Sequence, residues 1–406
     1  MRLLVIAVLV ILSSCVSKAQ KFSEENIRKH IEVLAHDSLG GRGTGTLGET
    51  AARNYIEKHF KALGLEPAGD ERKYSQAFTF HRGVHGQGES GTAYNIAGFL
   101  NNDAATTIII GAHYDHLGTD GQESSLDANP ATKIHNGADD NASGVAGVIE
   151  LARFYTTNDI KENNNFLFLC FSGEEMGLLG SKYFADHAPI ELSTVNFMIN
   201  MDMIGRLNPQ TKSLIVHGTG TSPVWEPLIK KLKPETLTIA TDSSGIGPSD
   251  HTSFYLKDIP VLHFFTGSHA DYHKPSDDIE KINLNGESEV LKFIARMIND
   301  LNDAGKLTFL KTKAKQQSSI ASFKVTLGIM PSYASDVEGL KVDGVTDGKP
   351  GDRAGLKTGD IIIQMGDFPV KDIYGYMDAL SKFKKEETVP VKVQRGKEVI
   401  TLSVTF

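Results

Sequence analysis

Cysteine, tryptophan and long apolar runs are all scarce in this sequence. Its 406 residues include two cysteines and one tryptophan, which excludes a framework of several disulfides. The apolar run Leu3–Leu12 is about half as long as a membrane-spanning helix. An excess of basic residues is also missing, because the formal net charge is -8 at pH 7. This balance argues against nucleic acid as a main partner, since binding to phosphates needs a basic surface.

The remaining composition is that of a soluble globular protein. Hydrophobic residues make up 40% and charged residues 23% of the chain, which is enough apolar material for a sizeable core. The length predicts two or three domains.

Residues 1–20 have the pattern of a secretory signal. Arg2 precedes the short apolar run, and Ser13, Ser14 and Cys15 follow it. Leu12-Ser-Ser-Cys15 resembles a bacterial lipobox, which implies export across the inner membrane, acylation of Cys15 and a lipoprotein anchored to a membrane of the cell envelope. The other cysteine, Cys170, lies in an apolar run and is interpreted as a buried, inert thiol.

Helical and strand patterns alternate from residue 22 to about 305. Strands are expected at 107–110, 165–171, 195–201, 214–216, 237–239 and 261–265, and helices at 48–63, 145–155, 176–187, 224–232 and 290–301. This order predicts an α/β fold with a mostly parallel central sheet and helices on both faces. Residues 306–319 are polar and lysine-rich and are predicted to be a linker, and 320–406 change to short strands and glycine turns.

The sequence contains five clusters of acidic residues and histidines, four of which directly follow predicted strands or precede helices. They are His113-Tyr-Asp115-His116, Asp139-Asp140-Asn141, Glu174-Glu175, Asp202 and Asp271-Tyr-His273. Each alone has a structural explanation, such as a helix cap for the Asp-Asp-Asn run. Together they favour a metal site, because the carboxyl ends of parallel strands form one rim where ligands bind.

The ligand types suit zinc, which binds histidine nitrogens and carboxylates and keeps an open position in catalytic sites. A carboxylate shared by two zinc ions would hold them about 3.5–4 Å apart. Asp115 is well placed to accept the other ring N–H of His113. Of two adjacent glutamates, one can bind metal while the other remains free as a base.

The ordered set of motifs resembles the M28 family of co-catalytic zinc aminopeptidases, from about residue 24 to 303. The resemblance implies a domain over 22–305 and two zinc ions, and it assigns the ligands by position. These are His113 and Asp202 for one zinc, Glu175 and His273 for the other, and Asp139 as the bridge.

The same resemblance implies that Glu174 is the general base and that Asp115 supports His113. It also implies a cis peptide bond between Asp139 and Asp140. Ser249-Asp250-His251 resembles a recurring family motif, although a plain helix start explains it equally well.

Residues 320–406 resemble a bacterial PDZ domain, chiefly through the run Ala354-Gly-Leu-Lys-Thr-Gly-Asp-Ile-Ile362. The resemblance implies that Leu327, Gly328 and Ile329 offer backbone N–H groups to a protein C-terminus while the bound peptide adds a strand. The alternative is a small β domain that only packs on the peptidase.

The sequence therefore predicts a secreted, lipid-anchored aminopeptidase that removes N-terminal residues from peptides. Three alternatives remain open. Glutaminyl cyclases share the fold but work with one zinc, and M20 carboxypeptidases use a similar ligand order but usually carry a lid domain before the last histidine. The third alternative is a catalytically inactive scaffold that binds peptides through the PDZ domain.

Overall fold

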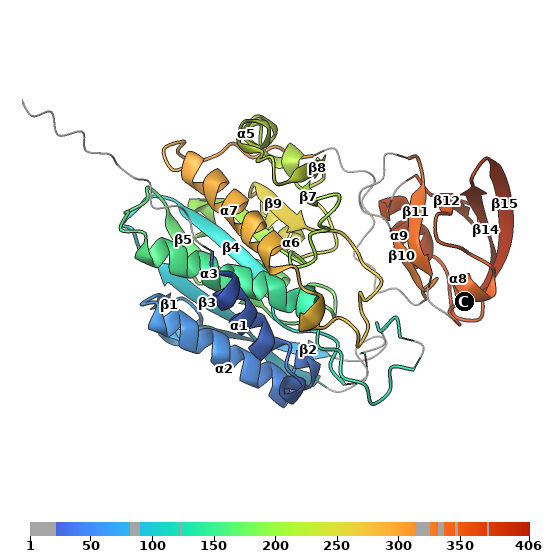
Figure 1. Cartoon of the computed structure of the whole chain (residues 1–406), viewed down its shortest axis with the longest axis horizontal. Coiled ribbons are helices and arrows are strands. Elements are labelled where there is room, and N and C mark those ends of the chain that lie inside the picture. Colours follow the sequence, from blue (N-terminus) through green and yellow to red (C-terminus); the bar gives the residue numbers. More distant parts are fainter. Residues whose placement is uncertain are drawn as a thin grey trace, which may run out of the picture.

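The computed structural model describes residues 22–81, 90–119, 121, 124–127, 129–312, 325–331, 337–345, 348–371 and 373–406. The expected signal segment, with Cys15, lies outside these residues. The chain forms a large domain around one sheet, followed by a smaller β-rich domain (Figure 1).

The large domain is built on a nine-stranded mixed sheet with the order β1-β3-β5-β4-β6-β9-β7-β8, and β2 pairs with β3. The central strands β5, β4, β6 and β9 are parallel. Antiparallel pairs join β3 to β1, β2 and β5, and β7 to β9. The α/β prediction is confirmed, and the sheet is parallel at its centre and again between the last two strands, β7 and β8. The strands are β1 Glu66–Pro67, β2 Ser75–His81, β3 Ser90–Leu100, β4 Thr107–His113, β5 Asn165–Phe171, β6 Val195–Met201, β7 Ser213–His217, β8 Thr238–Asp242 and β9 Val261–Phe265.

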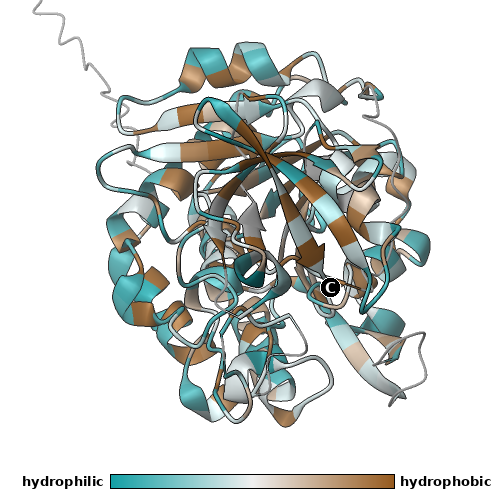
Figure 2. Ribbon diagram, turned by 90° about the vertical axis from the view of Figure 1, so that its right-hand side faces the viewer, coloured by the Kyte–Doolittle hydropathy of each residue, from teal (hydrophilic) through white to brown (hydrophobic). Residues whose placement is uncertain are grey.

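Helices cover both faces of this sheet. One face packs against α1 Glu24–Leu34, α2 Leu47–Ala62, α3 Gly144–Thr157, α5 Trp225–Leu232 and α7 Leu284–Asp300, and the other against α4 Leu179–Asp186 and α6 His251–Tyr255. Strand β5 shows why both faces are covered. Phe166 and Phe168 lie in the first apolar cluster and Leu167 and Leu169 in the second, because successive strand side chains point to opposite faces. Figure 2 shows the hydrophobic colour gathered on the central strands.

One buried arginine connects the N-terminal segment to the loops at the carboxyl end of the sheet. Arg42 is completely buried and donates hydrogen bonds to the carbonyl oxygens of Leu34, Tyr114, Asn136 and Gly137. Buried carbonyl groups need such partners. The guanidinium therefore fixes the loop after β4 against the turn before α3.

The C-terminal domain is a six-stranded antiparallel sheet with its own apolar cluster. Its elements are β10 Ile329–Pro331, β11 Leu340–Val345, α8 Pro350–Arg353, β12 Ile361–Met365, β13 Phe368–Pro369, α9 Ile373–Ser381, β14 Thr388–Arg395 and β15 Glu398–Thr405. Within the described ranges, none of the helices of either domain is both long and apolar enough to cross a membrane.

The first half of the predicted linker instead packs on the large domain. Leu307 is buried in its main apolar cluster, and Phe309 packs against the cluster on the other face. The backbone N–H of Leu310 donates to Thr221, and that of Thr312 donates to the hydroxyl of Tyr255. The linker prediction missed this packing, because two apolar residues among lysines show neither a helical nor a strand periodicity. Residues 313–319 lie outside the described part of the chain.

Candidate metal centre

The predicted ligands meet at the carboxyl ends of the adjacent central strands. His113 is the last residue of β4, Glu174 and Glu175 follow β5, and Asp202 follows β6. His273 comes from the loop after β9. These strands are neighbours in the sheet, so residues up to 160 positions apart converge on one rim.

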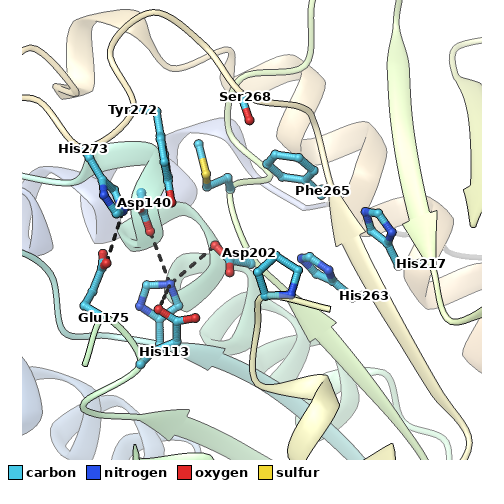
Figure 3. A pocket seen from close by; sticks show the side chains of 13 residues that line it. His113, Asp140, Glu175, Asp202, His217, His263, Phe265, Ser268, Tyr272 and His273 are labelled. Carbon is cyan, nitrogen blue, oxygen red and sulfur yellow. Dashed lines mark ion pairs between the residues drawn. The ribbon is translucent and has the colours of Figure 1, made fainter. Parts of the chain in front are cut away.

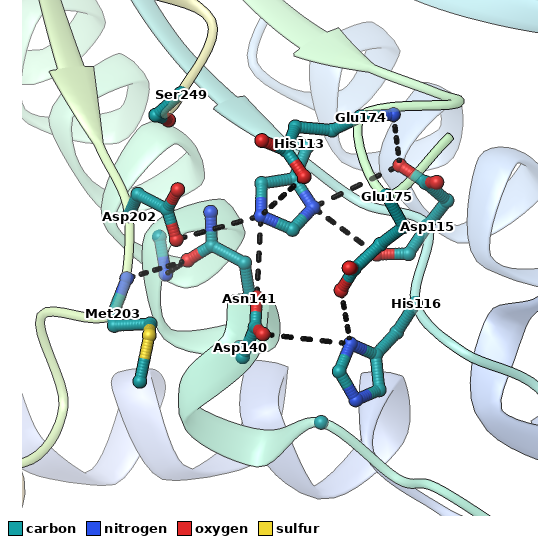
Figure 4. A network of polar contacts seen from close by, with 12 residues as sticks. His113, Asp115, His116, Asp140, Asn141, Glu174, Glu175, Asp202, Met203 and Ser249 are labelled. Atoms are coloured by element: carbon teal, nitrogen blue, oxygen red, sulfur yellow. Dashed lines mark hydrogen bonds and ion pairs between the residues drawn. The ribbon is translucent and has the colours of Figure 1, made fainter. Parts of the chain in front are cut away.

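His113 is the centre of one group of ligands (Figure 4). Its Nε2 atom lies 3.3 Å from Oδ1 of Asp140, 3.4 Å from Oδ1 of Asp202 and 4.0 Å from Oε2 of Glu174. The imidazole is 1% exposed. His113, Glu174 and Asp202 offer ligand atoms that all lie within 4.8 Å of one another, a spacing that suits one metal ion.

A second group lies on the other side of Asp140. Nε2 of His273 is 3.3 Å from Oδ2 of Asp140 and 3.2 Å from Oε2 of Glu175. The other oxygen of Glu175 lies 2.7 Å from Nδ1 of His116. The sequence interpretation gave His116 no role, although its position directly after Asp115 was a usable signal. His116 orients the glutamate that faces His273.

Asp140, rather than Asp139, lies between the two groups. Oδ1 of Asp140 faces His113 and Oδ2 faces His273, as a bridging carboxylate requires. Asp139 points away and accepts hydrogen bonds from the N–H of Gly205 and the hydroxyl of Ser143. The predicted position of Asp139 is therefore wrong by one residue.

The cis peptide bond is displaced in the same way. It joins Asp140 to Asn141, and not Asp139 to Asp140. Both aspartates are buried in one short turn, Ala138–Ser143, so neither composition nor strand position distinguishes them. The two aspartates differ in the direction in which their side chains point, and this direction is not visible in the sequence.

Asp115 is buried behind His113, and its contacts refine its predicted role. Its Oδ1 accepts from the backbone N–H of Glu174, and its Oδ2 accepts from the hydroxyl of Thr44. Nδ1 of His113 lies 3.2 Å from the backbone carbonyl of Asp115 and 3.7 Å from its carboxylate. Asp115 thus orients both the histidine and the start of the Glu174-Glu175 loop, and Thr44 holds it in place.

The charges at the site are strongly coupled. Burial is the main cause that raises the pKa of Glu174 well above its usual range, and the charges of Glu175 and Asp202 add to it. Burial opposes a charge on His113, yet Glu174 and Asp202 hold the pKa of its imidazole well above the ordinary value. Several carboxylates thus compete for few positive charges. A divalent cation would supply the missing charge, so the donor set fits zinc.

An open pocket contains this centre, and the candidate ligands form part of its wall (Figure 3). Its described lining continues past Asp202 to residues that are not ligands, namely Met203, His217, Pro248, His263, Phe265, Ser268 and Tyr272. None of these was predicted. The Ser249-Asp250-His251 motif is buried next to the site, where Ser249 accepts a hydrogen bond from Asn200. His251 begins helix α6, as the helix-start interpretation expected.

The predicted peptide-binding loop of the C-terminal domain lies just before and in β10. Leu327 is fully buried, and Gly328 has a positive φ of 68°, where a Cβ would come within 2.2 Å of the Lys349 side chain. The N–H of Gly328 already donates to the hydroxyl of Thr326. Docking of a carboxylate on Gly328 would therefore have to replace that bond.

The arrangement agrees with comparisons to known proteins. The model of peptidase family M28 matches residues 95–298, which is half of the chain. The chain belongs to peptidase family M28. A PDZ domain model matches residues 325–406, in agreement with the resemblance of the C-terminal region.

Individual relatives of this M28 protein are distant. It is 28% identical over 263 residues to leupeptin-inactivating enzyme 1 of Streptomyces exfoliatus, covering 63% of this chain and 52% of the relative. The chain spans about half the length of the curated relatives it matches.

Two solved structures share the fold. A zinc aminopeptidase from Bacillus subtilis superimposes with a TM-score of 0.53 at 18% identity, over 71% of this chain and 98% of that one. A glutaminyl cyclase from Bacteroides thetaiotaomicron gives 0.55 at 20% identity, over 68% and 98%.

Proposed function

We propose that this protein is a zinc-dependent aminopeptidase with two metal ions. The observation that carries the proposal is the position of Asp140, whose two oxygens face His113 on one side and His273 on the other. Asp202 completes the first group and Glu175 the second. Zinc ions held there would polarise the scissile carbonyl and lower the pKa of bound water.

The residues of the chain supply the remaining steps. The Glu174 carboxylate lies beside His113 and Asp202, within reach of a water molecule at that position. As the water oxygen bonds to the first peptide carbonyl carbon, Glu174 takes the proton. It then transfers this proton to the leaving nitrogen while the carbon–nitrogen bond breaks. The Asp115 side chain accepts the N–H of Glu174 and so holds the base in position.

Export and membrane anchoring through Cys15 are part of the proposal on the sequence pattern of residues 1–20 alone. The proposed substrates are peptides. Recognition of a protein C-terminus by Leu327, Gly328 and Ile329 is proposed as a separate property of the PDZ domain.

The test combines metal analysis with matched peptides. The purified protein should contain two zinc ions per chain and release the first residue of a short peptide. N-acetylation of the same peptide should abolish cleavage, because an aminopeptidase recognises a free α-amine. Rapid cleavage of internal bonds in the blocked peptide would contradict the proposal. Loss of ammonia from an N-terminal glutamine, detected by mass, would indicate a cyclase instead.

A further inference from the structure

The pocket that contains the metal centre ends on a stack of imidazole rings. His217 and His263 line the pocket beyond Asp202, on the side away from Glu175 (Figure 3). Their ring centroids are 5.2 Å apart, and His251 stacks behind His263 at 4.7 Å. His263 is 4% exposed and His217 is 8% exposed.

His263, the central ring of the stack, has hydrogen-bonding capacity that the described residues do not use. Within the described part of the chain, neither ring nitrogen of His263 has a hydrogen-bond partner. Burial, together with the neighbouring histidines, holds the pKa of His263 well below its ordinary value. Its ring is therefore neutral and offers one donor and one acceptor. A buried polar group of this kind costs free energy unless a ligand or water satisfies it.

A metal ion does not explain the stack. The rings are nearly parallel, with interplanar angles of 18° between His217 and His263 and 23° between His251 and His263. Their nitrogens therefore do not converge on a point. Among the described residues, the groups able to hold a metal contain none of the three.

We propose that this end of the pocket selects an uncharged, hydrogen-bonding side chain on the substrate's N-terminal residue. The carboxamide of glutamine or asparagine has these properties. The inference rests on the proposed aminopeptidase function. With the scissile carbonyl at the metal centre, the rest of the peptide leads away from the site. The side chain of the first residue can enter the pocket, where a carboxamide offers one acceptor and an N–H donor to His263 and His217.

Other side chains fit this end less well. An aliphatic side chain would displace water and leave the imidazole nitrogens unsatisfied. A carboxylate would find no fixed countercharge, since no Lys or Arg is among the described residues that line the pocket, and Asp242 lies 3.9 Å from His217. The ammonium of a lysine carries three donors and no acceptor, so it would leave the imidazole N–H of His263 unpaired, and the Pro248 and Phe265 side chains would accept none of its hydrogen bonds.

The experiment compares kcat/KM for fluorogenic amides of glutamine, asparagine, leucine, glutamate and lysine, with the full-length zinc-loaded protein. Glutamine or asparagine should exceed leucine at least tenfold. Calorimetry with free L-glutamine and L-leucine adds a readout that does not depend on turnover. L-glutamine should bind more tightly by a similar factor.

Two variants test the histidines directly. His263→Phe and His217→Phe retain a flat ring but remove the polar atoms, so each should lower the glutamine-to-leucine ratio about tenfold. His251→Phe is the matched control, because His251 stacks in the same row but does not line the pocket. It should leave the ratio unchanged. If His263→Phe does not fold, His217→Phe at the pocket wall still decides the result.

The outcomes separate this inference from the function on which it rests. Hydrolysis of all amides with leucine equal or preferred, or a ratio unchanged in both pocket variants, would overturn the selectivity and leave the aminopeptidase intact. Absence of hydrolysis for every amide in a zinc-loaded protein would overturn the proposed function and the inference with it.

Discussion

Two adjacent glutamates occupy different surroundings at the metal centre. Glu175 faces His273 and His116, whereas Glu174 lies beside His113 and Asp202. The first is held by two imidazoles, as a ligand should be. The second has its backbone N–H bonded to Asp115, and its side chain is 12% exposed at the pocket.

This difference predicts separate effects for two conservative substitutions. Glu174→Gln should lower kcat by roughly 10²–10⁴-fold, because the amide cannot accept the proton of the attacking water, while both zinc ions remain. Glu175→Gln should instead reduce zinc content, because a ligand oxygen is replaced by an amide. Metal analysis by mass spectrometry and steady-state kinetics on both variants distinguish the roles. Loss of zinc in Glu174→Gln with retention in Glu175→Gln would reverse the assignment.

The residue types of the site could be predicted from sequence, and some of their contacts could not. His113, Glu175 and Asp202 lie in clusters that follow predicted strands, and the resemblance to family M28 assigned them and His273 as ligands. Thr44 comes from a distant N-terminal segment, and the pocket residues His217 and His263 carry no local pattern. Their roles depend on the packing of segments that are far apart in the chain.

At the scale of elements, the turn before α3 decides which aspartate faces the metals. The carboxylate of Asp139 accepts hydrogen bonds from the N–H of Gly205 and the hydroxyl of Ser143. Nε2 of His269 lies 3.1 Å from the same carboxylate. The backbone N–H groups of Asp139 and Asp140 both donate to Asp277, which fixes the turn. The turn thus presents Asp140, rather than Asp139, to the site.

Paired substitutions in this turn give opposite expectations. Asp140→Asn should remove zinc from both positions, because the shared oxygens are lost. Asp139→Asn should retain zinc and lower the free energy of unfolding by about 1–2 kcal/mol, since it weakens buried hydrogen bonds. Zinc content and urea denaturation measure the two effects. Zinc loss in Asp139→Asn alone would restore the original sequence prediction.

The elements differ in how well sequence predicts them. The boundaries of β5, β6 and β9 agree with the sequence prediction, because these strands are buried on both faces and consist mainly of apolar residues. Strands β2 and β3 were not predicted. β2 alternates buried and more exposed residues, and β3 begins with Ser90 and Gly91, which have little strand preference.

At the scale of the whole molecule, each domain has its own apolar core, and the connection between them begins later than sequence suggested. Leu307 and Phe309 belong to the cores of the large domain. The division into domains could be predicted from the change in texture near residue 320. The position of the boundary could not, because it depends on two apolar side chains within a polar segment.

The boundary predicts the behaviour of two truncations. A chain that ends after Thr312 should keep zinc and full activity on the smallest substrates. One that ends after Asp303 should unfold more easily, by roughly 2–4 kcal/mol, since it loses the buried Leu307 side chain and its neighbours. Thermal melting and hydrolysis of an aminoacyl amide test both. Loss of activity in a folded chain ending at Thr312 would mean that the PDZ domain completes the active site.

The wide spacing of the ligands along the chain also determines when the metal centre can form. His113 and His273 are separated by 160 positions, and the sheet brings them together only when β4 and β9 flank β6. Such distant contacts form late, because closing long loops must precede them. The complete set of ligands therefore does not exist before these strands have paired, and formation of the whole site depends on the fold of the sheet.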